Sequence, residues 1–407
     1  MAHQTLHEYY RREDFLPTYG RFQSAGDLAE HALHRRRLFT DKLFLPPRLF
    51  QGARLIEFGP DSGENSLVFA QWGARCTLVE PNPNAHPQIR DYFERFGLKD
   101  RLAHLDGRDL AAFAATPLVS GETYDIVDAE GFIYTVRPES LWIDLFARLL
   151  ADDGLVILFY YEHFGGFMEL LLKAIHACMR RTTGMGALES AQALFAAKWD
   201  SIAHKRTLQA WVMDVLENPF VRLEYFLDAR SLCDRLHQAG LHLYSSWPPY
   251  RDGLDVHWFK RVPSLEEVRK GEGAFIARSR LSHLCGRKLF LIEQDESLEA
   301  ELNPLLTAVD ALIDDTDRAA LEACREALSR VSERLQSARI LADPQDIAET
   351  LALIGSLERI LQFLSTDATA ELAAFCAADR AFLHFWGMPS HFAVFRKGPT
   401  ASEAGAC

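Results

Sequence analysis

Two acidic residues and two glycines form the part of this sequence that is best suited to chemistry. Glu57 ends the predicted strand 53–58, and Gly59 and Gly63 follow it directly before a predicted helix. Glu80 ends the next predicted strand. Glycine lets a backbone approach a ligand closely, and the first N–H groups of a helix have no partner inside the helix. Because a carboxylate at the end of the second strand can accept hydrogen bonds from both hydroxyls of a ribose, this spacing predicts a site for an adenosine-containing cofactor.

The residue between the two glycines indicates which cofactor this is. A dinucleotide-binding loop reads G-x-G-x-x-G, and its second glycine makes room for a pyrophosphate. Here that position holds Asp61, whose carboxylate repels phosphate. An acid-rich loop is better suited to a cofactor that carries an ammonium and a sulfonium group. The sequence therefore predicts S-adenosylmethionine.

The segment that carries these residues resembles the class I S-adenosylmethionine-dependent methyltransferases. The run from Glu57 to Gly63 matches their first motif, and Glu80 matches their ribose-binding acid. The resemblance implies that Asp106 in "HLDGRDL" contacts the adenine and that "YDIVDAEGFIYTV" is the fourth-strand segment. It covers about residues 50–262 and implies a sheet with the strand order 6-7-5-4-1-2-3. Asp61 is a departure, because many members have a third glycine there.

The predicted cofactor site combines these motif residues with their neighbours along the chain. Its members are Glu57, Gly59, Pro60, Asp61, Gly63, Glu80, Pro81, Asp106, Gly107, Asp128 and Ala129. Alternatives stay open for some of them. The glycines can be turn residues only, Glu80 a surface acid, and Asp106 a cap for the helix that begins near Arg108.

Candidates for acid–base chemistry follow the fourth and fifth predicted strands. Methyl transfer requires an acceptor placed in line with the sulfonium and, for some acceptors, a base that takes a proton. Glu130 and Tyr134 follow the fourth strand, and His163 follows the fifth, next to Glu162. His163 is the best proton acceptor by chemistry. A hydrogen-bonded structural histidine and transfer by placement alone are the alternatives, and the dispersed histidines predict no metal site.

Short apolar runs alternate with helical stretches between residues 53 and 161, as in a parallel sheet covered on both faces. Residues 164–218 are predicted to be a helical insertion. A helix at 229–239 and two strands at 241–247 and 255–262 follow, the last strand being antiparallel. The fold class is therefore α/β: a seven-stranded, doubly wound, Rossmann-like methyltransferase sheet with a helical insertion and an all-helical C-terminal extension.

Four stretches of chain are expected from these patterns. Residues 1–50 form an N-terminal helical lid, in which the run Arg35-Arg36-Arg37 is a solvated helix face or an anchor for an anionic substrate. Residues 51–262 form the cofactor-binding domain, 263–295 a connector and 296–397 a helical C-terminal domain. Within the last domain, Asn303-Pro304 and Asp343-Pro344 each place a capping side chain before a proline at a predicted helix start.

Composition narrows the choice of partners. The 407 residues carry 44 basic and 57 acidic side chains, a net charge of −13, which argues against a protein that neutralises phosphates over a broad surface. Residues 296–386 hold 7 basic and 17 acidic side chains, so this stretch is a solvated helical surface or a docking site for a protein partner or a second copy. Seven cysteines without a paired motif, no signal-peptide pattern and no apolar run of membrane length predict a cytoplasmic protein without a membrane partner.

The expected function is methyl transfer from S-adenosylmethionine to oxygen or nitrogen of a small-molecule or glycan-type acceptor, in line with the sulfonium. Two alternatives stay open at this point. One is a protein or RNA methyltransferase that docks through its C-terminal helices, although their negative charge disfavours RNA. The other is a non-catalytic scaffold that binds the cofactor and recruits a partner.

Overall fold

The computed structural model describes residues 5–398, except 18–21, 23, 117–122, 204–205, 254–262, 294–295 and 316. The chain divides into two compact units, each built from separated segments. The sheet unit consists of Met1–Tyr160, Ser231–Tyr250 and His391–Cys407, and the helical unit consists of Tyr161–Arg230 and Arg251–Ser390.

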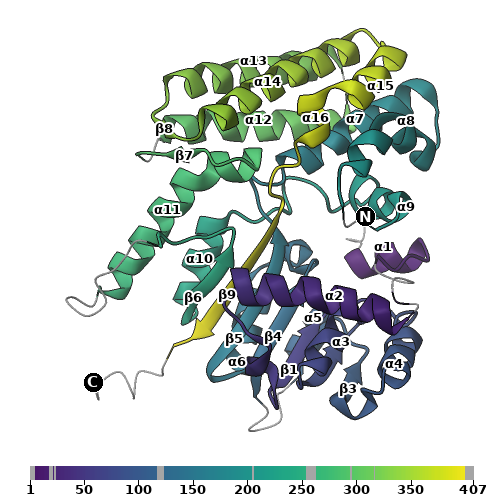
Figure 1. The fold of residues 1–407 in the computed structure, drawn as a ribbon, viewed down its shortest axis with the longest axis vertical. Helices are drawn as coiled ribbons and strands as arrows, with labels where there is room; N and C mark the ends of the chain where they lie inside the picture. Colours follow the sequence, from purple (N-terminus) through teal and green to yellow (C-terminus); the bar gives the residue numbers. More distant parts are fainter. Residues whose placement is uncertain are drawn as a thin grey trace. The chain divides into compact units, whose positions relative to one another are not determined.

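A seven-stranded sheet is the centre of the sheet unit (Figure 1). In the order in which they lie side by side, its strands in the described part of the chain are β3 (Leu102–Asp106), β2 (Arg75–Val79), β1 (Arg54–Phe58), β4 (Tyr124–Glu130), β5 (Leu150–Tyr161), β9 (Ser390–Lys397) and β6 (Leu241–Trp247). Strands β1 to β5 pair in parallel, and β6 and β9 pair antiparallel. The expected sheet order is confirmed, and the strand in its seventh position is antiparallel to β6.

Helices cover both faces of this sheet, which explains the continuous apolar runs in its strands. The helices of the sheet unit are α1 (Leu6–Arg12), α2 (Ala25–Arg37), α3 (Glu64–Gln71), α4 (His86–Arg95), α5 (Leu110–Ala115), α6 (Ser140–Leu149) and α10 (Ala229–Gln238), with short turns η1 (Leu38–Lys42), η2 (Pro47–Phe50), η3 (Lys99–Arg101) and η4 (Ile133–Thr135). Leu55, Cys76 and Leu78 of the strands are fully buried in one core cluster with Phe39 and Phe50. Part of the stretch expected to be a lid therefore belongs to the core of the sheet unit.

The seventh strand comes from a part of the chain that the sequence did not indicate. The strand expected at 255–262 lies outside the described residues. Strand β9 (Ser390–Lys397) stands between β5 and β6 instead, and its apolar residues Ala393, Val394 and Phe395 are buried. The expectation of an all-helical C-terminal stretch was therefore wrong at its end. The reason is physical: β9 is specified largely by long-range pairing with β6, and its apolar run 392–395 is too short for its pattern to distinguish a strand from a helix.

The helical unit contains the insertion and the C-terminal helices. Its elements are α7 (Phe167–Thr183), α8 (Ala187–Asp200), α9 (Leu208–Trp211), η5 (Val212–Leu216), α11 (Leu265–Cys285), β7 (Phe290–Leu291), α12 (Glu296–Asp314), α13 (Arg318–Ser337), β8 (Ile340–Leu341), α14 (Pro344–Ser365), α15 (Thr369–Ala378) and α16 (Arg380–His384). Helices α12, α13 and α14 lie side by side (Figure 1). The helical insertion predicted at 164–218 is confirmed.

Two predictions within the helical unit were wrong. The stretch 263–295, expected to be a connector, contains the 21-residue helix α11, which begins after the capping box of Ser264 and Glu267. Its glycines hid the helical pattern, and Gly273 lies where a Cβ would be 3.2 Å from the Arg230 side chain. Pro304 lies inside α12 and not at a helix start, because buried leucines on both sides hold the helix continuous. Asp343 does cap α14, by accepting the Gln345 N–H at 2.8 Å.

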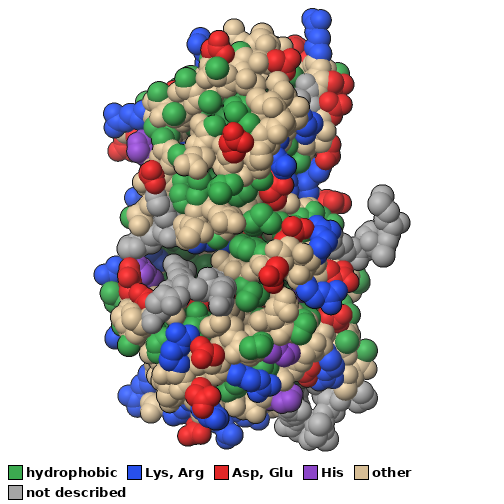
Figure 2. Space-filling view, turned by 90° about the vertical axis from the view of Figure 1, so that its right-hand side faces the viewer, with side chains coloured by type: hydrophobic (Ala, Val, Ile, Leu, Met, Phe, Trp, Pro, Cys, Tyr) green, Lys and Arg blue, Asp and Glu red, His purple; other side chains and the backbone are tan. Residues whose placement is uncertain are grey.

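The described surface is mixed in charge. On the face shown in Figure 2, lysine and arginine side chains are interspersed with aspartate and glutamate side chains. No helix in the described ranges is both long enough and apolar enough to span a membrane.

Candidate functional site

The loop between β1 and α3 contains three residues in the left-handed region. Gly59 has a φ of 64°, Asp61 of 51° and Gly63 of 90°. Aspartate tolerates this region better than most residues with a side chain. Asp61, the departure in the motif, thus keeps a backbone conformation that glycine would favour.

Gly59 is required by a neighbouring side chain as well as by its backbone conformation. A Cβ at this position would lie 2.7 Å from the ring of Phe132, which follows β4. From the sequence alone, we explained Gly59 by the close approach of a ligand to the backbone. The structure shows that the protein itself fills the space beside it.

Glu80, directly after β2, fixes the same loop from the other side. Its Oε2 accepts the backbone N–H of Asp61 at 3.0 Å, and its Oε1 accepts the N–H of Asn82 at 2.7 Å. The side chain is 5% exposed, and burial raises its pKa to about 8. A carboxylate with spare lone pairs beside the glycine loop can accept ribose hydroxyls.

Asp106, at the end of β3, is held by Arg108. Its Oδ1 accepts the backbone N–H and the Nε–H of Arg108, both at 2.9 Å. These hydrogen bonds hold the pKa of the Asp106 carboxyl below its usual value. The helix that follows is capped by Asp109, which accepts the Ala112 N–H at 2.7 Å, and not by Asp106. Contact of Asp106 and Gly107 with adenine stays a prediction.

Buried carboxylates meet where β1 and β4 run in parallel. The register places Glu57 beside Asp128 and Phe58 beside Ala129. Glu57 accepts the Ser66 hydroxyl at 2.5 Å. Burial raises the pKa of Glu57 to about 8 and raises that of Asp128 well above its usual value. Neither oxygen of the fully buried Asp128 has a hydrogen-bond partner among the described residues.

Arg35 of α2 lies over this cluster. Its two terminal nitrogens each donate to one oxygen of Glu130 at 2.7 Å, and its guanidinium lies 4.6 Å from the Phe39 ring centre. Asn65 also donates to Glu130, at 3.0 Å. Burial alone would lower the pKa of Arg35, but the carboxylates of Glu130 and Asp128 raise it overall. Of the arginine run 35–37, this residue alone is buried, and the run was the signal for it in the sequence.

The candidates for proton transfer are not all placed together. Glu130 and Tyr134 lie in the sheet unit with the cofactor residues, and Tyr134 is 2% exposed. His163 lies in the helical unit, where its Nε2 is 3.0 Å from Asn303 Oδ1 and burial lowers its pKa. Glu162 accepts the backbone N–H groups of Phe164 and Gly165 at 2.9 and 2.7 Å. One of its two oxygens, Oε2, is thus engaged by its own turn.

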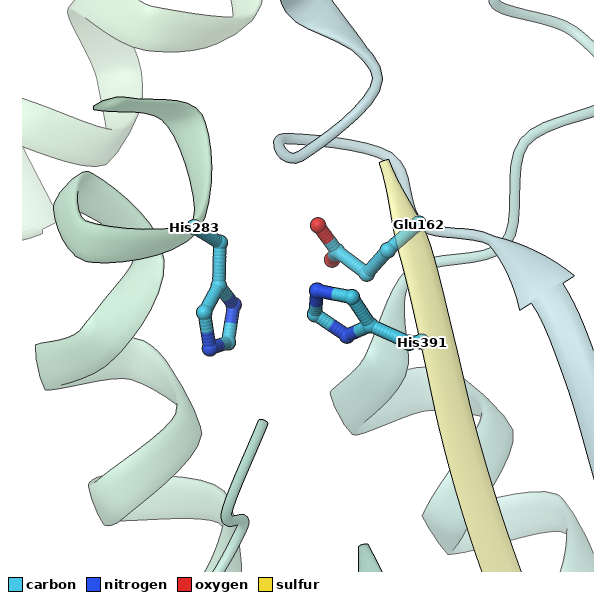
Figure 3. Close-up of side chains that lie close together, drawn as sticks. All are labelled: Glu162, His283 and His391. Carbon is cyan, nitrogen blue, oxygen red and sulfur yellow. The ribbon is translucent and has the colours of Figure 1, made fainter. Parts of the chain in front are cut away.

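Glu162 and His283 are side chains of metal-ligating types within the helical unit. Their possible ligand atoms lie within 4.8 Å of each other, and Figure 3 shows both, with His283 on α11. The third residue labelled there, His391, belongs to the sheet unit. Two side chains of one unit do not define a metal centre, so we assign no metal to them.

The sequence matches the family model of the methyltransferase domain over residues 29–246. Because this is more than half of the chain, the protein belongs to that family, the class I S-adenosylmethionine-dependent methyltransferases. Its cofactor is S-adenosylmethionine, as the sequence predicted.

Several solved structures resemble parts of the chain. The CcbJ methyltransferase from Streptomyces caelestis shares 16% identity over 37% of this chain and 57% of its own, with a TM-score of 0.29. A putative sarcosine dimethylglycine methyltransferase from Galdieria sulphuraria shares 10% identity over 91% of this chain and 88% of its own, with a TM-score of 0.37. Magnesium protoporphyrin IX methyltransferase from Synechocystis PCC 6803 shares 16% identity over 40% of this chain and 78% of its own, with a TM-score of 0.30. The chain spans only 57% of CcbJ and 46% of TehB from Haemophilus influenzae. A search of curated proteins finds no match.

The residues of the sheet unit fit this cofactor. The ammonium and sulfonium groups of S-adenosylmethionine are cations, and Glu57 and Asp128 are buried acids whose pKa values are raised by burial. A cation bound beside them would favour their ionised form, because little water screens the attraction. The same acids disfavour the phosphates of a dinucleotide.

Proposed function

We propose that this chain transfers the methyl group of S-adenosylmethionine to oxygen or nitrogen of a small-molecule or glycan-type acceptor. One observation carries the choice of a small acceptor: the buried pair of Arg35 and Glu130 fastens α2 to the end of β4. A helix held at this end of the strand would cover the acceptor, and a covered acceptor is more easily a small molecule than a segment of a folded protein or an RNA. Methylation of protein or RNA is the alternative that the assay below addresses.

Each part of the cofactor has a partner of matching chemistry in the sheet unit. Glu80 would accept the ribose hydroxyls, and Asp106 and Gly107 would border the adenine. Glu57 and Asp128 would face the cationic end, and the Arg35 guanidinium would balance the methionyl carboxylate. Pro60, Pro81 and Ala129 complete the lining. The bound cofactor supplies a methyl group on positively charged sulfur.

The chain's own residues then orient the acceptor and exclude water. Both oxygens of Glu130 are engaged by Arg35, so this residue is proposed as a positioning group and not as the base. Tyr134 is proposed as a wall of the acceptor site. Placement of the acceptor carries most of the rate in this proposal.

The variant His163→Ala distinguishes methyl transfer with His163 as the base from methyl transfer by placement of the acceptor alone. If His163 takes the proton, single-turnover methylation falls by about 10²–10⁴ while cofactor affinity is unchanged. Burial lowers the pKa of His163, so the parent rate should then fall as the pH drops through a value below the ordinary 6.5. If placement suffices, which we expect, the loss is much smaller and that pH dependence is absent.

Calorimetry on Glu80→Gln tests the cofactor site. The amide replaces one acceptor oxygen by a donor and so removes at least one charge-assisted hydrogen bond, worth about 1.5–3 kcal/mol, and affinity for S-adenosylmethionine should fall about tenfold or more. Glu94→Gln on α4 is the matched control, because that side chain is 71% exposed, and it should bind like the parent. Equal binding by both variants would contradict the site.

A methyl-release assay then tests the acceptor. Pools of small molecules and glycans, of proteins and of RNA are each offered with labelled cofactor, and activity is expected only with the first pool. Activity confined to the protein or RNA pool would overturn the acceptor class, and cofactor binding without transfer to any pool would favour a scaffold.

A further inference from the structure

Basic side chains outnumber acidic ones in the lining of a cavity in the helical unit. It has a volume of about 650 Å³ and lies among α7, the turn after it and the chain from Leu216 to Arg222. The basic residues that line it are Lys173, His176, Arg180, Arg181 and Arg222, and the acidic one is Glu217. This excess of cations contrasts with the net charge of −13 of the whole chain.

Carboxylates match two of these cations. Arg222 donates to Asp310 at 3.0 Å and to Asp314 at 2.7 Å. Arg180 contacts both oxygens of Glu217 at 2.7 Å. Arg180 is therefore neutralised by Glu217, and Arg222 carries one charge against two on Asp310 and Asp314, so neither guanidinium adds positive charge to the cavity.

The other two cations have neutral partners. The Lys173 ammonium donates to the Asn218 carbonyl oxygen, and Arg181 donates to the carbonyls of Ile313 at 2.6 Å and Leu312 at 3.1 Å. Lys173 is only 6% exposed. Since residues 173 and 181 are eight apart on α7, they lie on the same side of that helix.

Burial makes the charge on Lys173 costly. It lowers the pKa of this amine to about 8, and the nearby Arg222 guanidinium lowers it further. His176 adds no second positive charge beside it, because burial lowers its pKa too, and its Nε2 lies 2.9 Å from the Ala187 carbonyl oxygen. Glu217, Asp310 and Asp314 face the same region but are held by the arginines. A buried ammonium with a neutral partner is stabilised by an added anion.

We propose that this cavity binds a small organic phosphate ester, with the phosphate between Lys173 and Arg181. Arginine has five N–H donors, and the carbonyl contacts of Arg181 leave donors for phosphate oxygens. The organic part would lie against the apolar lining, which consists of Ala177, Met185, Leu216 and Pro219. The volume falls within the range of about 300–1,000 Å³ that is usual for small-molecule sites.

Calorimetry with phenyl phosphate and with inorganic phosphate, at pH 7 and constant ionic strength, tests the proposal. We expect one phenyl phosphate per chain, bound more tightly than inorganic phosphate. Lys173→Met and Arg181→Gln should each weaken binding at least tenfold. Arg359→Gln, an exposed arginine on α14 of the same unit, is the matched control and should bind like the parent.

The outcomes that overturn the proposal are distinct. Absence of saturable binding, unchanged affinity in Arg181→Gln or an equal loss in Arg359→Gln would each reject the site. Equal affinity for phenyl phosphate and inorganic phosphate would show that the apolar lining does not bind the organic part of the ester. Because Arg181 is exposed, its variant serves if Lys173→Met does not fold. Affinity should also fall above about pH 8 as the Lys173 amine loses its proton, and Lys173→Met should lack that fall.

Discussion

At the scale of single residues, the sequence shows where the cofactor motif lies but not which contacts hold its residues in place. The positions of Glu57, Gly59, Gly63 and Glu80 follow from the sequence, because each stands where a predicted strand or helix begins or ends. Their partners are side chains distant in the chain: the Phe132 ring beside Gly59 and the Asp61 N–H on Glu80. Only the folded chain shows that the protein's own side chains hold the glycine loop.

Gly59→Ala should destabilise the protein through the Phe132 ring and the left-handed backbone. The backbone alone contributes about 1–2 kcal/mol, and the added Cβ must displace the ring. In a Phe132→Ala background the cost of Gly59→Ala should be smaller, and urea unfolding of the four proteins measures the difference. Strict additivity would contradict the contact.

Buried carboxyl groups should make stability depend on pH. Glu57, Glu80 and Glu162 have an ordinary value of 4.5, and burial raises the pKa of each to about 8. Between these values the folded chain binds more protons than the unfolded chain, so the free energy of unfolding should fall as pH rises and level off above about 8. Between pH 4.5 and 8, each group lowers the free energy of unfolding by about 1.4 kcal/mol per pH unit.

Urea unfolding between pH 5.5 and 8.5, without cofactor, measures this slope. Glu162→Gln should have a shallower slope than the parent, because its amide can still accept the turn's N–H groups but cannot titrate. Parallel slopes for the two proteins would contradict the assignment.

At the scale of elements, the sequence predicted what is encoded locally. Strands β1 to β6 and helices such as α4 and α6 have apolar runs of the right period, bounded by glycine or by capping residues. Strand β9 and helix α11 were missed for different reasons. The pairing of β9 with β6 joins residues about 150 positions apart, and α11 contains two glycines that weaken its helical pattern.

Helix α2 should depend on the buried ion pair between Arg35 and Glu130. Arg35→Gln leaves Glu130 buried beside two other acids, at a cost of about 3–5 kcal/mol. The double variant Arg35→Gln, Glu130→Gln should recover part of this loss, since no unpaired charge remains. Arg36→Gln, exposed on the same helix, should change the free energy of unfolding by less than about 0.5 kcal/mol. Thermal and urea unfolding measure all three, and a double variant no more stable than Arg35→Gln would contradict the pair.

At the scale of the whole molecule, the two units are interleaved and do not follow each other along the chain. The sequence divided the chain into consecutive stretches at 50, 262 and 295. The sheet unit in fact uses three separate segments, the last of which supplies β9. Composition changes along the chain predict consecutive domains. They do not show where the chain re-enters a sheet after an insertion.

Truncation tests the interleaving. A chain that stops after residue 389 lacks β9, so β5 and β6 lose the strand between them, and we expect aggregation or loss of cooperative unfolding and of cofactor binding. A chain that stops after residue 398 keeps every described strand and should behave like the parent. Solubility, calorimetry and binding measure the difference. A soluble, cofactor-binding 1–389 fragment would show that β9 is dispensable.

The position of β9 also sets an order of events during synthesis. Six strands of the sheet leave the ribosome with residues 54–247, yet the gap between β5 and β6 stays open until residues 390–397 emerge. The helices α11 to α16 are translated during that interval and can fold while the sheet still waits for its strand. For roughly 140 residues of translation, the nascent chain therefore exposes two unpaired strand edges, a state in which binding by a chaperone would matter most.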